Sequence, residues 1–522
     1  MRGRGAVLLL AVLLAVPALP QGVFAADEDL QKKVDALSKE VQSLQQQVAQ
    51  SKEGSKEGAK EGAKEGKKSI SDWLTIGGDY RFRVDSLRGE VPSYLSFANY
   101  LAWAMPPNNG AGAPTITPGT TVKNDTLYTN RFGLNIKAKV MEDVVFFTRL
   151  LMYKEFGSQE NSAAKGTFFA DRIGVFDGTQ GHVPSDGGVT VDQVYMTINN
   201  IFDQPIWFSV GRRPSTGGIP THLRQDNEKP GVSGVSGLLV DYAYDGMTLG
   251  YAPDIESLPG MYAKLCYGRG YQHGFQSDLP GDVKNMDMIG LVVVPYDTDP
   301  LSIHLQVNRG MNIIDFPVIP DSSLGSLSPT TNLGDIDQFG VVVMSTLKNM
   351  GPGKLNLFAS AAMDKTHPNG NTVVMNTPFG PINTGAGLMY TGAEESTTGS
   401  AIYLGGRYDL PSKTLLGFEY NHGSKNWISF IPAADDIWTS KLGTRGNVYE
   451  IYVIQELPGL SIASVNAKSL VRVGYQYYDF EYTGSNNWVG APVKISDVAA
   501  SPQMLTPIKT AKDLYATVEV RF

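Results

Sequence analysis

Hydrophobic and polar residues alternate with a period of two along most of the chain from residue 73 onward. The C-terminal segment 514–522 reads LYATVEVRF, with Leu, Ala, Val, Val and Phe at the even positions. Successive side chains of a β-strand point to opposite faces, so this pattern predicts strands with one apolar and one polar face. The last strand of a soluble β-sandwich would alternate in the same way, so this segment alone does not fix the fold class.

The connections between the strands decide between these folds. They are long after the odd-numbered strands and mostly tight after the even-numbered ones, as at 141–143, 297–299 and 410–412. A soluble sandwich has no reason to sort its loops in this way, whereas an outer-membrane barrel has short turns on one side and long loops on the other. The sequence therefore predicts an all-β fold, a 16-stranded antiparallel transmembrane β-barrel over 73–522, with strands at 73–85, 126–140, 144–155, 188–200, 205–213, 236–245, 260–270, 286–296, 300–309, 336–348, 353–363, 399–409, 413–422, 446–456, 467–481 and 511–522.

One connection departs from this rule. Residues 246–259 follow an even-numbered strand, yet they are long enough to contain a further short strand. A missed pair of strands would raise the count to eighteen, so both numbers remain open at this point.

The N-terminal end indicates export. Arg2 and Arg4 precede an apolar run at 6–16, and small residues end at Ala25, so residues 1–25 are predicted to be a secretory signal peptide. Beyond this segment the sequence contains no stretch of about eighteen apolar residues, so no transmembrane helix is predicted. An exported chain without such helices can cross a membrane only as a closed barrel, which satisfies all its backbone hydrogen bonds. We therefore expect the outer membrane as its location, with the N-terminal segment in the periplasm.

Two segments lie between the signal peptide and the first strand. Residues 26–50 form a predicted coiled coil, because apolar residues recur at spacings of four and three. A helix of three heptads is only marginally stable alone, so we expect it to associate with the same helix of further copies of the chain. The alternative is a single amphipathic helix that packs on the surface of another protein or domain. Valine at the a positions and leucine at the d positions favour a coiled coil of two helices, although a porin-like trimer would override that preference. The predicted seam comprises Leu30, Val34, Leu37, Val41, Leu44 and Val48.

Residues 51–72 contain four Lys-Glu-Gly repeats and are predicted to be a linker. A glycine at every fourth position costs about 1 kcal/mol each in a helix, so a solvated spacer is expected. Contact of the Lys-Glu ladder with peptidoglycan is the alternative.

The charged faces of the strands predict the lining of a lumen. An Arg or Lys on the lipid side costs roughly 2–4 kcal/mol at the membrane midplane, so the charged side should face inward. The first five strands supply mostly basic residues, which favours anions; alternatively, these arginines bind neighbouring acids and only stiffen the barrel. The predicted pore-lining residues are Asp79, Arg81, Arg83, Arg131, Lys137, Lys139, Arg149, Arg213, Glu419 and Arg472.

The loop after the fifth predicted strand, 214–235, is the candidate constriction. It combines several glycines with charged residues, among which Arg224, Asp226 and Glu228 are the candidate constriction residues.

Composition excludes several other classes. With 44 basic against 52 acidic residues, the chain is not expected to bind nucleic acid. Its one cysteine, Cys266, allows neither an internal disulfide nor a c-type haem, and no metal-binding spacing is present, so no cofactor or metal is predicted. His422 and Ser424 resemble the His-x-Ser pair of the outer-membrane phospholipase, but the match ends there, so no enzymatic activity is expected.

The opening strand WLTIGGDYRFR at 73–83, the preceding coiled coil and the terminal Phe522 resemble sixteen-stranded bacterial porins. They are similar in particular to substrate-specific porins with a periplasmic coiled coil, including the phosphate-selective type. The segment VGRRPSTGGIPTHLR at 210–224 is similar to uncharacterised porins of metal-reducing bacteria. This resemblance implies a trimer in outer-membrane lipid and a role for Phe522 as the insertion signal for the barrel-assembly machinery.

The function expected from these features is a passive diffusion channel for small polar solutes with an anion preference. The alternative is a structural barrel, either a sheath for an electron-transfer partner or a tether between outer membrane and cell wall.

Overall fold

The computed structural model describes residues 70–522, apart from 159–183, 215–218, 230–236, 276–282, 316–318, 323–324, 328, 378–379, 432–435 and 458–466. The predicted signal peptide, the coiled-coil seam and nearly all of the linker lie outside the described residues. Within the described part of the chain, no helix is both long enough and apolar enough to cross a membrane.

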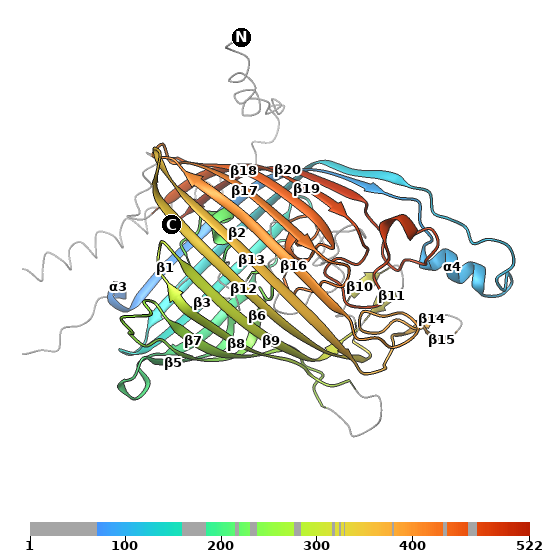
Figure 1. Ribbon diagram of the computed structural model, residues 1–522, viewed down its shortest axis with the longest axis horizontal. Helices are drawn as coiled ribbons and strands as arrows, with labels where there is room; N and C mark the ends of the chain where they lie inside the picture. The colour runs from blue at the N-terminus through green and yellow to red at the C-terminus, as the bar shows by residue number, and fades with distance from the viewer. Residues whose placement is uncertain are drawn as a thin grey trace, which may run out of the picture. The chain divides into compact units, whose positions relative to one another are not determined.

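Sixteen antiparallel strands form a closed barrel, as the sequence predicted (Figure 1). Each strand pairs with the next along the chain, and the last pairs with the first, so that no sheet edge is left open. Phe522 extends this closing pair, because its N–H and C=O bond to Gly78 at 3.0 and 2.8 Å. The strands are β1 (Leu74–Val91), β2 (Thr120–Lys139), β3 (Val144–Glu155), β4 (Thr190–Ile198), β5 (Ile206–Pro214), β6 (Ala243–Tyr251), β7 (Tyr262–Tyr271), β8 (Met286–Asp297), β9 (Ser302–Ile314), β12 (Asn332–Met350), β13 (Gly353–Pro368), β16 (Thr398–Asp409), β17 (Thr414–Gly423), β18 (Gly446–Glu456), β19 (Lys468–Phe480) and β20 (Thr510–Arg521).

The two ends of the barrel differ in their connections. Short turns join the strands at the end where β1 begins and β20 ends, and long loops join them at the other end. We call these the short-turn end and the long-loop end. In Figure 1, β1 and β2 run beyond the neighbouring strands to the helix α4 at the tip of their loop. The minor elements are α3 (Ile70–Trp73), α4 (Phe97–Ala104), η3 (Ile201–Asp203), α5 (His222–Gln225), the hairpins β10 (Ile319–Ser322) with β11 (Gly325–Leu327) and β14 (Val374–Thr377) with β15 (Gly380–Asn383), η4 (Lys441–Gly443) and η5 (Ile495–Asp497).

The sixth strand is not where the sequence pattern placed it. The prediction of 236–245 is wrong, because β6 runs from Ala243 to Tyr251 and overlaps the predicted strand only at its last three residues. Most of β6 lies in the connection 246–259, which is long enough for a further strand. The apolar run Leu238–Val240 is at most 2 % exposed inside the barrel and belongs to the loop, not to the wall. The count of sixteen is unchanged.

Apolar side chains cover the outside of the wall. On β18 and β20, Ile451 and Leu514 are more than half exposed, while Glu450 and Tyr515 beside them point inward and are buried. The same alternation on β1 leaves Ile76 exposed and buries Arg83. An apolar exterior around a charged interior is the arrangement of a transmembrane barrel.

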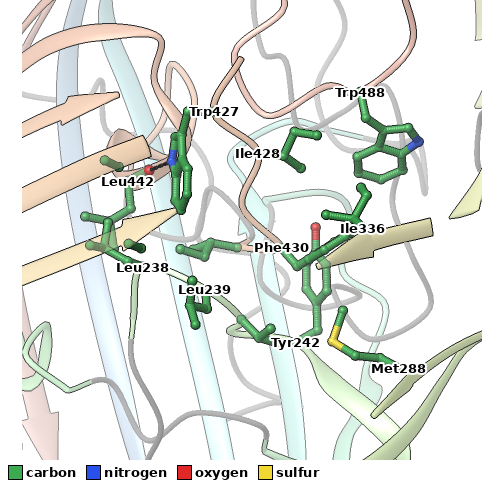
Figure 2. Close-up of a cluster of buried hydrophobic side chains, with 14 of the residues drawn as sticks. Leu238, Leu239, Tyr242, Met288, Ile336, Trp427, Ile428, Phe430, Leu442 and Trp488 are labelled. Carbon is green, nitrogen blue, oxygen red and sulfur yellow. Dashed lines mark hydrogen bonds between the residues drawn. The ribbon is translucent and has the colours of Figure 1, made fainter. Parts of the chain in front are cut away.

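The interior of the barrel contains a hydrophobic cluster that the sequence analysis did not anticipate (Figure 2). Two long loops contribute to it together with the wall, and they pair with each other: Phe430 donates its N–H to the carbonyl of Leu239 at 2.9 Å and accepts from Asp241 at 2.8 Å. The loop side chains pack against Met288 and Ile336 of the wall. The loop residues of the cluster that Figure 2 labels are Leu238, Leu239, Tyr242, Trp427, Ile428, Phe430, Leu442 and Trp488.

Candidate channel interior

The loop after β5 reaches the opposite side of the barrel. Its α5 segment exposes backbone carbonyls that arginines of the far wall bind: Arg407 on β16 donates to Leu223 at 2.6 Å, and Arg472 on β19 donates to Arg224 at 2.9 Å. Arg521 of β20 donates to the carbonyl of Asp226 at 2.7 Å. A chain segment that starts on the fifth strand of the ring is thus anchored to three of the last five.

The side chain of Arg224 is the centre of a buried charge cluster. Its guanidinium donates to Asp436 at 2.5 Å and to Glu450 at 3.0 Å, and all three side chains are largely buried. Burial alone would lower the pKa of Arg224, but Asp436, Glu450 and Glu419 raise this pKa well above its ordinary value. The arginine therefore remains charged inside the barrel.

Glu419 and Glu450 lie directly opposite each other on β17 and β18, where two like charges would repel. Lys441 from the loop after β17 contacts both carboxylates, at 2.6 Å from Glu450. Tyr515 donates to Glu450 at 2.6 Å, and Tyr403 donates to Glu419 at 2.5 Å. These contacts make the acidic pair part of the packed interior.

The predicted pore-lining residues on β1–β3 divide into two groups. Arg131 and Arg149 are partly exposed and share Asp79, at 3.4 and 2.6 Å. Lys137 and Lys139 are exposed towards the short-turn end. By contrast, Arg81 and Arg83 are each 1 % exposed; Arg83 binds Asp85 and Asp513, and Arg81 lies over the ring of Tyr153.

The remaining predicted residues are also covered by other parts of the chain. Arg213, Glu419 and Arg472 are 8 %, 1 % and 2 % exposed. Partly exposed charges of the described interior include Arg131 and Arg149 on β2 and β3 and, at the short-turn end, Lys468 and Arg521 on β19 and β20. Farther from that end, the β16–β20 side is covered by the two inward loops.

The three candidate constriction residues do not stay together. Arg224 and Asp226 are buried inside the barrel, where Asp226 accepts from Arg407 at 3.1 Å and pairs with Lys468. Glu228 is exposed. Phe522 is exposed on the outside of the closing strands.

Asp436, Lys441 and Arg407 are interior residues that the sequence pattern did not predict. Asp436 and Lys441 belong to a loop, where no periodicity indicates a direction. Arg407, in contrast, follows the alternation of β16 and could have been recognised as inward-facing.

His422 and Ser424 make separate contacts. The ring of His422 is 3.0 Å from Asn447 Oδ1, and the Ser424 hydroxyl accepts the N–H of Ser400 at 2.9 Å. Among the described residues, no three His, Cys, Asp or Glu side chains gather as metal ligands.

A family model described as "Protein of unknown function (DUF3373)" matches residues 121–522, well over half of the chain. The chain belongs to this family. No curated protein sequence matches this DUF3373 chain.

Solved structures similar to the DUF3373 barrel include outer-membrane porins. OmpT of Vibrio cholerae, in its trimer form, is 13 % identical with a TM-score of 0.40, covering 86 % of this chain and 99 % of its own. OprB of Pseudomonas putida is 11 % identical with a TM-score of 0.41, covering 87 % and 95 %. The anion-selective porin from Comamonas acidovorans is 12 % identical with a TM-score of 0.39, covering 86 % and 98 %.

Proposed function

We propose that this DUF3373 chain is an outer-membrane porin, a passive diffusion channel for small polar solutes with a preference for anions. The observation that carries the proposal is the closed sixteen-stranded barrel with an apolar exterior and a charged interior. A closed barrel leaves no unpaired strand edge, so its backbone can lie in lipid. Oligomers, insertion by the barrel-assembly machinery through Phe522 and absence of catalysis are parts of the same proposal.

The route for solutes follows the β1–β3 side of the interior. The loop after β5 and the loop after β17 fill the adjoining β16–β20 side, where Glu450 and Arg472 are at most 2 % exposed. On the β1–β3 side, Arg131, Arg149 and Lys137 retain exposed surface; Asp79 binds both arginines, and Asp192 also lies 3.5 Å from Arg149. Local rings of charge set the selectivity of a pore. This basic side therefore supports an anion preference, although the net charge of the whole chain is negative.

No observation favours the alternative of a structural barrel. A sheath would have to accommodate a partner, and the described interior already contains this chain's own loops. A tether would depend on residues 26–72, almost all of which lie outside the described residues.

Single-channel recording in planar bilayers tests the proposal. The purified protein should give stepwise current openings, and the reversal potential in a KCl gradient should show chloride preference. Replacing both Arg131 and Arg149 with alanine should reduce that preference. Lys123→Ala removes an exposed charge near the long-loop end and should leave it unchanged. A silent protein would overturn the channel function, and an unchanged reversal potential in the double variant would overturn the proposed route.

A further inference from the structure

A small cavity of about 50 Å³ lies between the inner face of β5–β9 and the loop residue Val240. Its polar lining comes from four different strands: Arg213, Thr248, Cys266, Gln306 and Asn308. No carboxylate is among the described residues that line it. The cavity lies behind the loop, on a part of the wall that does not belong to the proposed solute route.

Glycines on the inner face of the wall make room for this cavity. A methyl group at Gly290 on β8 would overlap the side-chain oxygen of Asn308, and one at Gly268 on β7 would lie 2.6 Å from Cβ of Tyr244. Both glycines line the cavity. An alanine at either position would force Asn308 or Tyr244 to move, so the space depends on these residues.

Two hydrogen-bond donors of the lining have no partner. The side chains of Arg213 and Asn308 are 8 % and 7 % exposed, and neither Arg213 Nε nor Asn308 Nδ2 makes a hydrogen bond. The guanidinium of Arg213 binds Thr248 through its Nη1 and also interacts with the side chain of Cys266, while Asn308 accepts from Gln306, so both side chains are held in place. A buried donor without an acceptor costs about 1–3 kcal/mol, and more for a charged group.

The electrostatic environment of the cavity is positive. Arg213 is the one charged side chain among the described residues that line it. Apolar side chains, including Val240, Met288 and Val292, enclose the space. Charge interactions are stronger in such surroundings than in water, so an acceptor that carries a negative charge fits better than a neutral one.

The volume limits the size of this acceptor. One water needs roughly 10–15 Å³ of such space, so the cavity accommodates a few water-sized groups. We propose that this cavity is a binding site for a small monovalent anion of the size of chloride, bromide or nitrate, held by Arg213 and Asn308. Binding there is independent of whether the barrel conducts.

Bromide is a suitable probe, because its anomalous scattering locates it directly. Crystals of the full protein soaked in sodium bromide should show an anomalous peak between Arg213 and Asn308. The peak should be absent in Arg213→Gln and present in Arg212→Gln, which changes the neighbouring residue of the same strand. A wild type without the peak, or a peak that persists in Arg213→Gln, would overturn the proposal.

Thermal unfolding in detergent gives a second measurement, with bromide replacing gluconate at constant ionic strength. The wild type should be stabilised with a saturable dependence on bromide, and Arg213→Gln should weaken binding by about tenfold or more, because a charge-assisted hydrogen bond is lost. If Arg213→Gln does not fold, Gly290→Ala decides, since it fills the cavity without removing a charge. Bromide stabilisation that is unchanged in Gly290→Ala would overturn the site.

Discussion

The guanidinium of Arg224 lies 3.0 Å from the carboxylate of Glu450, although 226 residues separate them in sequence. Arg224 comes from the loop after β5, and Glu450 is on the inner face of β18. Their pairing fixes the loop against the far wall. The position of the loop in the barrel therefore depends on a contact between two buried charges.

Replacing Arg224 with methionine should release this loop. The variant leaves Glu419 and Glu450 with the ammonium of Lys441, while Asp436 keeps neutral hydrogen bonds from the Lys441 backbone N–H and from Gln476. Removing one partner of a buried ion pair typically costs about 3–5 kcal/mol, so the thermal unfolding temperature in detergent should fall clearly. Single-channel conductance should rise or become noisier, because the loop no longer occupies one position.

Glu228→Gln is the matched control, since it changes a charge of the same loop at an exposed position. It should leave both the unfolding temperature and the conductance close to wild type. If Arg224→Met behaves like this control, the buried cluster does not hold the loop.

Aromatic rings of a neighbouring strand pack over glycines on the inner face of the wall. Gly474 on β19 faces Tyr515 on β20, and a methyl group at Gly474 would overlap the tyrosine ring. Gly474→Ala should displace Tyr515 and break its 2.6 Å hydrogen bond to Glu450. Overpacking of this kind costs typically 1–3 kcal/mol. Denaturant unfolding should show this loss, and Tyr515→Phe, which keeps the ring, should lose only the hydrogen bond.

Arg445 connects three long loops at the long-loop end. It is 1 % exposed and donates to the carbonyls of Trp427 and Thr483 at 3.1 Å and of Asn487 at 2.5 Å, while its Nη2 is 3.3 Å from the sulfur of Met389. Arg445→Met removes this donor from the buried carbonyl of Trp427 and the partly buried carbonyls of Thr483 and Asn487, at a cost on the order of 3 kcal/mol in total. Limited proteolysis should then cut the loops faster while the barrel stays intact. Lys425→Met, at an exposed position of the same loop, should not change the cleavage rate.

The wall of the barrel could be predicted from the sequence because its strands carry their own signal. Each strand has an apolar outer face and a polar inner face, so the alternation of residues such as Ile451 and Glu450 records the two faces directly. The wrong prediction of the sixth strand also follows from an apolar pattern. Leu238–Val240 are apolar because they are buried in the interior cluster, and a short apolar run does not distinguish a wall strand from a buried loop.

The interior could be predicted only in part. Alternation identified Arg83 and Glu419 as inward-facing, but not whether water or another loop would cover them. Whether a loop covers these side chains depends on contacts between loops, such as that of Phe430 with Leu239. Loop sequences have no periodicity from which such contacts could be predicted. The partly exposed state of Arg131 and the buried state of Arg83 follow from where the loops lie, and this is a property of the whole fold.

The apolar exterior leads to a prediction that tests the membrane location itself. Ile451 lies in the middle of β18, points outward and is 57 % exposed. In lipid, Ile451→Arg should cost roughly 2–4 kcal/mol, because an arginine near the midplane must leave water. Folding into phospholipid vesicles, followed by the gel shift of the unheated protein, should therefore be reduced. Ile451→Ala, which is smaller but apolar, should fold nearly as well as the wild type. Equal folding of the arginine and alanine variants would mean that this face does not contact lipid, and the membrane-spanning assignment would fail with it.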